Sequence, residues 1–192
     1  MTIVIPGMVT ISLLSLFYCS MLPETGRKAR MQAFERQYIA HRGFHDNRSE
    51  CPENSLPAFE RAIQMGYGIE LDVQLTKDGV PVVFHDWDLK RAAGVDRKIR
   101  DCTFEELQSY RLFGSSQTIP AFEAVLELAD GRAPLIIELK AEIVHRELCE
   151  KCAALLDCYP GEYCIESFSP LALGWFKCHR PNVLRGQLAT NH

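Results

Sequence analysis

The chain has 192 residues, of which 47% are hydrophobic and 24% are charged. This length and composition indicate one globular domain with a sizeable core. The net charge of −4 excludes the strongly basic surface that nucleic-acid binding needs, so we expect no nucleic-acid partner.

The amino-terminal segment is the most apolar part of the chain. Residues 2–22 contain no charged side chain, and basic residues follow at Arg27, Lys28 and Arg30. An apolar run of this length predicts a membrane-spanning helix, and the basic residues after it favour the cytoplasmic side for the rest of the chain. We therefore expect residues 1–30 to form a transmembrane anchor with a basic linker, and residues 31–192 to form the folded domain. The alternative is a cleaved signal and an exported protein, but no small-residue cleavage site stands out.

Strands and helices alternate after the linker. Strands are predicted at 38–41, 68–74, 81–85, 134–139, 162–166 and 183–188, with helices at 55–65, 103–110, 121–128, 144–156 and 170–178. This alternation predicts parallel strands joined by right-handed crossovers. The long stretch from Asp86 to Gln117 is expected to be an insertion above the sheet.

Polar side chains collect at the ends of four of these strands: His41, Glu70 with Asp72, His85, and Glu138 with Lys140. The carboxyl ends of the strands form one face of a β/α barrel, and catalytic residues lie there. The rival fold is a doubly wound open sheet, which would usually carry a glycine-rich phosphate loop, and this chain has none. We therefore predict an α/β fold of the (β/α)8 TIM-barrel type.

Carboxylates alternate with apolar residues along the second predicted strand. Glu70 and Asp72 share one face of it, while Ile69, Leu71 and Val73 occupy the other. Inside a barrel, unpaired carboxylates are costly unless a cation joins them. Hard oxygen ligands favour Mg²⁺ or Ca²⁺, and Glu138 is placed to reach the same centre. The alternative is an ordinary pair of solvent-facing carboxylates on an edge strand.

The two histidines at strand ends suit acid–base chemistry. A histidine with its ordinary pKa of about 6.5 can gain or lose a proton near neutrality, so His41 and His85 could act as base and acid. Arg42 lies beside His41 and Lys140 beside Glu138 in the sequence, and both could neutralise phosphate oxygens. Structural histidines and ordinary surface charges are the alternatives.

The ordered motifs resemble those of the glycerophosphodiester phosphodiesterases. They are His41-Arg42-Gly43, Pro52-Glu53-Asn54-Ser55, Glu70-x-Asp72-Val73, Thr76-Lys77-Asp78-Gly79, His85-Asp86 and Ile137-Glu138-Leu139-Lys140. The resemblance implies a phosphodiesterase-type barrel in which Glu70, Asp72 and Glu138 bind the metal and His41 and His85 are the acid–base pair. It also implies that Arg42 and Lys140 contact phosphate, with Glu53 and Asn54 supporting the first loop. The implied substrates are glycerophosphodiesters, and the products are glycerol 3-phosphate and an alcohol.

The strand count falls short of a closed barrel. Six strands are predicted where eight are needed, and the segment from Tyr38 to His192 is shorter than the roughly 200 residues of a small barrel. We therefore expect a domain that is truncated after its sixth strand and incomplete at its carboxyl end. Two alternatives to glycerophosphodiester hydrolysis stay open: a same-fold enzyme acting on another lipid phosphodiester, or an inactive fragment that only binds head groups or a partner.

Overall fold

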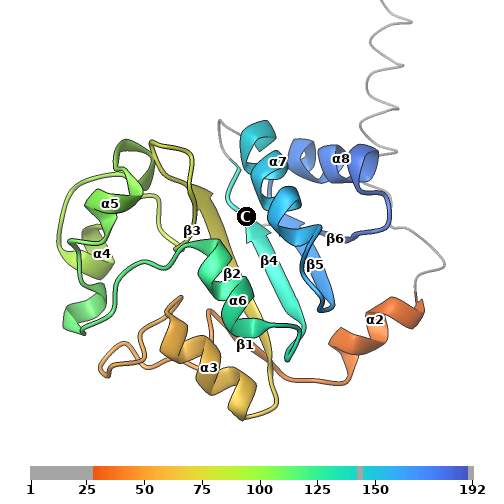
Figure 1. Cartoon of the computed structure of the whole chain (residues 1–192), viewed down its shortest axis with the longest axis horizontal. Helices are drawn as coiled ribbons and strands as arrows, with labels where there is room; N and C mark the ends of the chain where they lie inside the picture. Colours follow the sequence, from red (N-terminus) through yellow and green to blue (C-terminus); the bar gives the residue numbers. More distant parts are fainter. Residues whose placement is uncertain (1–27, 142–144, 190–192) are drawn as a thin grey trace, which may run out of the picture.

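The computed structural model describes residues 28–141 and 145–189, and a mixed sheet lies at its centre (Figure 1). Five strands follow the order β1-β2-β4-β5-β6, and every pairing along this path is parallel. A sixth strand, β3, pairs with β2 outside that path. The strands are β1 (Ile39–His41), β2 (Gly68–Leu75), β3 (Pro81–Val83), β4 (Leu135–Leu139), β5 (Tyr163–Ser167) and β6 (Leu184–Gln187). The predicted α/β class is confirmed, with strand boundaries within two residues of those expected.

Amphipathic helices bury the apolar side of the sheet. They are α3 (Leu56–Gln64), α6 (Phe122–Ala129), α7 (His145–Leu156) and α8 (Pro170–His179). Ile69, Leu71 and Val73 of β2 are fully buried in one core cluster with Phe122 and Val125 of α6. The apolar face of β2 thus packs against helices, and its acidic face lies on the opposite side of the sheet.

The prediction that all strands run parallel is wrong for β3, which pairs antiparallel with β2. The two strands are joined by a tight turn in which the Thr76 amide donates to the Val80 carbonyl over 3.1 Å. Gly79, at a φ of 74°, closes this turn. A parallel connection needs a crossover of a dozen or more residues, so a five-residue link allows only a hairpin. The described sheet therefore contributes five parallel strands instead of six.

The insertion between β3 and α6 forms a small lobe with its own core. It contains the short helices α4 (Lys90–Ala93) and α5 (Phe104–Leu107) and the 3-10 turns η1 (Ile99–Asp101) and η2 (Leu112–Gly114). Leu89, Ile99, Leu107, Leu112 and Ile119 are all fully buried in the lobe core. In Figure 1 the lobe lies beyond β3, away from β5 and β6. The expected insertion is thus a folded unit.

The described sheet is open, with β1 at one end of the parallel path and β6 at the other. The predicted anchor, within residues 1–30, lies almost entirely outside the described residues, and helix α2 (Lys28–Glu35) spans the predicted boundary at residue 30. Among the described helices, none is long and apolar enough to cross a membrane.

Candidate active site

Three carboxylates meet on the acidic face of β2 and β4. The strand register places Asp72 directly beside Glu138, and Glu70 lies two residues before Asp72 on the same face. One oxygen from each of these side chains lies within 4.8 Å of the others. The predicted convergence of Glu70, Asp72 and Glu138 is thus observed, and backbone register is what produces it.

Only part of the negative charge of this triad is balanced by protein cations. Lys140 Nζ lies 3.1 Å from Asp72 Oδ1 and 3.0 Å from Glu138 Oε1. Arg42 Nε lies 3.6 Å from Asp72 Oδ2. Burial, followed by the charge of Asp72, raises the pKa of Glu70 to about 8. Burial also raises the pKa of Glu138, against the opposing charge of Lys140.

The triad fits a divalent metal ion by two independent features. Asn54 is buried beside Asp72, and its side-chain oxygen has no hydrogen-bond partner among the residues that the structure describes. Such atoms carry a desolvation cost that an additional partner would remove. Two oxygen ligands of one Mg²⁺ or Ca²⁺ ion lie at most about 4–5 Å apart, which agrees with the spacing of the triad. The three carboxylates could therefore hold such an ion.

The first loop, residues 42–55 between β1 and α3, reaches the triad through strained backbone. Arg42 and Asn54 both lie in the left-handed region, at φ values of 56° and 55°. For residues other than glycine this costs on the order of 1–3 kcal/mol each, and surrounding contacts must hold it. The Asn54 amide donates to the Arg42 carbonyl over 2.9 Å, and the Arg42 amide donates to Glu70 Oε2 over 3.0 Å. Next to Arg42, a Cβ on Gly43 would lie 2.9 Å from the Ala58 backbone, so only glycine fits there.

Asn54 directly precedes the residue that caps helix α3 but does not cap the helix itself. Ser55 is the N-cap residue, and its hydroxyl accepts from the Ala58 amide over 3.4 Å. The Asn54 side chain points instead into the site, where Nδ2 donates to Asp72 Oδ2 over 2.9 Å. An N-cap residue normally has an extended backbone. Asn54 instead has a left-handed backbone, which directs its side chain toward Asp72.

His41 lies at the end of β1, opposite Glu70 in the register of β1 and β2. Its Nε2 lies 3.9 Å from Glu70 Oε2, and its side chain is 67% exposed. Burial of the remainder and the charge of Arg42 lower the pKa of His41. A neutral imidazole at neutral pH has a lone pair available to accept a proton.

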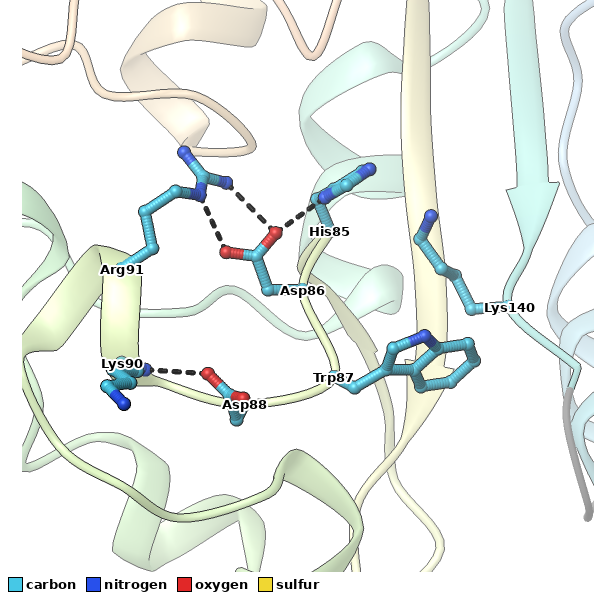
Figure 2. Close-up of a pocket in the computed structure, with 7 residues that line it drawn as sticks. All are labelled: His85, Asp86, Trp87, Asp88, Lys90, Arg91 and Lys140. Carbon is cyan, nitrogen blue, oxygen red and sulfur yellow. Dashed lines mark hydrogen bonds and ion pairs between the residues drawn. The ribbon is translucent and has the colours of Figure 1, made fainter. Parts of the chain in front are cut away.

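His85 follows the antiparallel strand β3, so it approaches the site from the hairpin and not from a barrel strand end. The Phe84 amide, just before it, donates to the Asp72 carbonyl over 2.9 Å, which places His85 near the level of the triad. His85 and Lys140 line one open pocket of about 450 Å³ together with Asp86, Trp87, Asp88, Lys90 and Arg91 (Figure 2). His85 and Lys140 thus lie in one pocket, although His85 comes from the hairpin and Lys140 from the end of β4.

Three polar residues of this region were not predicted as site residues. Asp86 Oδ1 lies 2.6 Å from His85 Nδ1, and Arg91 contacts Asp86. Glu166 of β5 lies beside Glu138 in the register, and burial raises its pKa. Glu166 ends a strand as Glu138 does, and this signal could have identified it. Arg91 also contacts Glu53, 38 positions earlier in the chain, and a contact between such distant segments leaves no local signal.

Comparison with known proteins places these residues in a family. Residues 41–165 match the glycerophosphoryl diester phosphodiesterase family, and the chain belongs to it. A glycerophosphodiester phosphodiesterase of Bacillus altitudinis is 44% identical over 109 residues, which cover 53% of this chain and 43% of that protein. A human lysophospholipase D is 32% identical over 170 residues, which cover 82% of this chain and 51% of that protein. The chain thus spans about half the length of the curated relatives it matches.

Solved structures agree on the fold. A phosphodiesterase of Oleispira antarctica, in complex with the product sn-glycerol-3-phosphate, superposes with a TM-score of 0.72 at 30% identity, covering 81% of this chain and 67% of that one. A glycerophosphodiester phosphodiesterase of Thermotoga maritima superposes with a TM-score of 0.65 at 33% identity, covering 81% of this chain and 62% of that one. The predicted barrel type is confirmed, although the described sheet does not close.

Proposed function

We propose that this protein hydrolyses glycerophosphodiesters to glycerol 3-phosphate and an alcohol with the help of a divalent metal ion, Mg²⁺ or Ca²⁺. The observation that carries the proposal is the buried triad of Glu70, Asp72 and Glu138, whose oxygens lie within 4.8 Å of one another beside two basic side chains. Family membership supports the reaction class. When bound, the ion would offset phosphate charge and make an attacking oxygen more acidic.

The remaining roles fall to side chains around the triad. His41 accepts the proton of the attacking oxygen, which its lowered pKa and open position favour. His85 donates a proton to the leaving alcohol from Nε2, because Nδ1 is engaged by Asp86. Arg42 and Lys140 balance the charge of the phosphate oxygens, as cations do at such sites. Glu53 and Asn54 hold the first loop in place through Arg42 and Asp72.

The decisive assay follows release of glycerol 3-phosphate from glycerophosphocholine by the purified full chain. We expect turnover with Mg²⁺ or Ca²⁺ and its loss in EDTA, with restoration on adding the ion back. Glu70→Gln, purified in parallel, controls for contaminating hydrolases. Equal turnover in EDTA would contradict the metal's role. No turnover with any ion, together with retained glycerol 3-phosphate binding, would favour the inactive head-group binder.

A second substrate class, the lysophospholipids, is favoured by one feature of the pocket. Trp87 lines the pocket beside His85 and is 41% exposed, so it offers an apolar surface to the acyl chain, which a lysophospholipid carries on the glycerol that stays with the phosphate. The similarity to a lysophospholipase D supports this candidate. Lysophosphatidylcholine assayed against glycerophosphocholine separates the two, and Trp87→Ala should reduce turnover of the lipid more than that of the water-soluble substrate.

We also propose that residues 1–30 anchor the domain to a membrane with the domain on the cytoplasmic side. The support is the uncharged segment 2–22 followed by Arg27, Lys28 and Arg30. Deleting residues 1–30 should release the protein from the membrane pellet, and protease added to intact cells should leave the domain uncut. Cleavage from outside would favour the exported alternative.

A further inference from the structure

One guanidinium in the insertion lobe holds two carboxylates from different loops. Arg91 Nε donates to Asp86 Oδ2 over 2.7 Å, and its NH2 donates to Asp86 Oδ1 over 3.2 Å. On the other side, NH1 donates to Glu53 Oε2 over 3.0 Å, and NH2 also donates to Glu53 Oε1. Figure 2 shows Arg91 and His85 on opposite sides of the Asp86 carboxylate. Forked pairs of this kind fix orientation as well as charge.

The Glu53 end of this arrangement leads back to the triad. Glu53 is 7% exposed, and it also accepts from Arg42 NH1 over 3.0 Å and from Asn47 Nδ2 over 2.8 Å. Although burial opposes the shift, bonds from Arg91 and Asn47 lower the pKa of Glu53 to about 2, so it stays ionised. Arg42 in turn donates its amide to Glu70. One continuous chain of polar contacts therefore runs from His85 to the metal-binding carboxylates.

The Asp86 end determines the proton arrangement of His85. Although burial opposes the shift, bonds from Arg91 and His85 lower the pKa of Asp86, so its carboxylate is ionised at neutral pH and can only accept. His85 Nδ1, 2.6 Å away, must then carry the proton. This leaves Nε2 as the nitrogen that meets substrate.

The lobe gives Arg91 a firm base. Arg91 lies on α4 between the buried residues Leu89 and Ala92, and its guanidinium lies over the ring of Phe113, 5.3 Å from the centroid. Helix α4 and the turn η2, which carries Phe113, pack against each other. The lobe core thus holds the backbone of Arg91 in place, and the two carboxylates hold its guanidinium group.

We propose that Arg91 is a positioning residue that orients His85 through Asp86 and locks the first catalytic loop through Glu53. This inference rests on the proposed function for its kinetic consequences, but its structural core concerns the imidazole of His85 alone. It also assigns a purpose to the insertion: the lobe delivers one arginine to a point between the two histidine-bearing loops.

The first experiment reads the ring of His85 directly. Nitrogen-15 NMR of the full chain, with His85→Gln to assign the signal, reports which ring nitrogen carries the proton. We expect Nδ1 of the parent to keep its proton both in the neutral ring and in the imidazolium that donates from Nε2, whereas the neutral ring of Arg91→Met should be a mixture that contains the Nε2–H form. Arg180→Met is the matched control, because Arg180 makes a similar forked pair with Asp157, at 2.7 and 2.6 Å, far from His85 in the fold. An unchanged Nδ1–H signal in a folded Arg91→Met would overturn the proposal, whether or not the protein turns over substrate.

The second experiment separates positioning from direct substrate binding. Outer partners of site residues typically contribute 10–100-fold, so Arg91→Met should lower kcat about tenfold or more with KM nearly unchanged. Arg91→Lys keeps the charge, but its ammonium cannot bridge the four carboxylate oxygens, so its kcat should lie between those of the parent and Arg91→Met. If Arg91→Met does not fold, Arg91→Lys provides the test. In an Asp86→Asn background, Arg91→Met should lower kcat less than it does in the parent, since the contact through Asp86 is already lost and only the contact with Glu53 remains. A raised KM with unchanged kcat, or full additivity, would instead make Arg91 a substrate ligand and refute the proposal.

Discussion

Glu70 and Glu53 are two carboxylates of one site with opposite environments. Glu70 lies on β2 among other acids, and burial and Asp72 raise its pKa to about 8. Glu53 lies in the first loop, where Arg91, Asn47 and Arg42 overcome the effect of burial and lower its pKa to about 2. The strands therefore gather acidic side chains that disfavour one another's charged forms, whereas Glu53 is paired with basic side chains that stabilise its charge.

The difference separates two tasks that a site of this kind must perform. A carboxylate whose charged form is destabilised by its neighbours gains from a cation supplied from outside. A carboxylate already satisfied by arginine gains nothing from such a cation and is suited to holding geometry. We infer that β2 and β4 provide the ion-binding part of the site and the loops provide its alignment.

Removing one strand carboxylate should have the largest effect on activity. Glu70→Gln keeps an oxygen that the Arg42 amide can still reach but loses a metal-ligand charge. Because a bound metal contributes several kcal/mol to such reactions, we expect a loss of about a thousandfold or more in kcat. Steady-state kinetics in excess Mg²⁺ and Ca²⁺ measure it. Near-parental turnover would show that the triad is not the ion site.

The two histidines should follow in size of effect. His41→Ala and His85→Ala should each lower kcat about a hundredfold, the usual contribution of a general acid or base. A nitrophenyl ester needs no protonation of its leaving group, so it should rescue His85→Ala and not His41→Ala. Equal losses on both substrates in both variants would refute the division of roles.

The pH dependence of stability should distinguish strand from loop carboxylates. The folded-state pKa of Glu70 lies above its ordinary value of 4.5, so its contribution to stability is full below pH 4.5 and is lost as pH rises to about 8. In EDTA, the Tm of the parent minus that of Glu70→Gln should therefore fall between pH 5 and 8. Glu53 has the opposite sign: its contribution is present above pH 4.5 and is lost as pH falls toward 2. The difference between the parent and Glu53→Gln should shrink on acidification, and matching slopes for the two variants would erase the contrast.

A change in the lobe away from these carboxylates should have the smallest effect. Thr103 caps α5 in a capping box with Glu106. Thr103→Ala should lower the free energy of unfolding by about 1 kcal/mol and leave kcat unaltered. Urea unfolding and the same kinetic assay measure both. A large loss of kcat would mean that the lobe core controls Arg91 more tightly than its contacts suggest.

Local sequence patterns were sufficient for the strand-borne half of the site. The alternation of acidic and apolar residues from Ile69 to Val73 predicts an oily face and an acidic face, and the register of parallel strands brings Glu138 beside Asp72. A two-residue period and the rule that parallel strands end at one edge are properties of the backbone, so they can be inferred without coordinates.

The tertiary structure alone decided the other half. The short turn after Leu75 made β3 antiparallel, so that His85 reaches the site from a hairpin. Arg91 meets Glu53 across 38 positions of sequence, and no periodicity encodes that meeting. Secondary structure follows local steric and apolar patterns, whereas an ion pair between two loops depends on where a separately folded lobe comes to rest. The sequence by itself therefore determined the acidic triad of this protein, and its packing determined how the triad is aligned with the histidines.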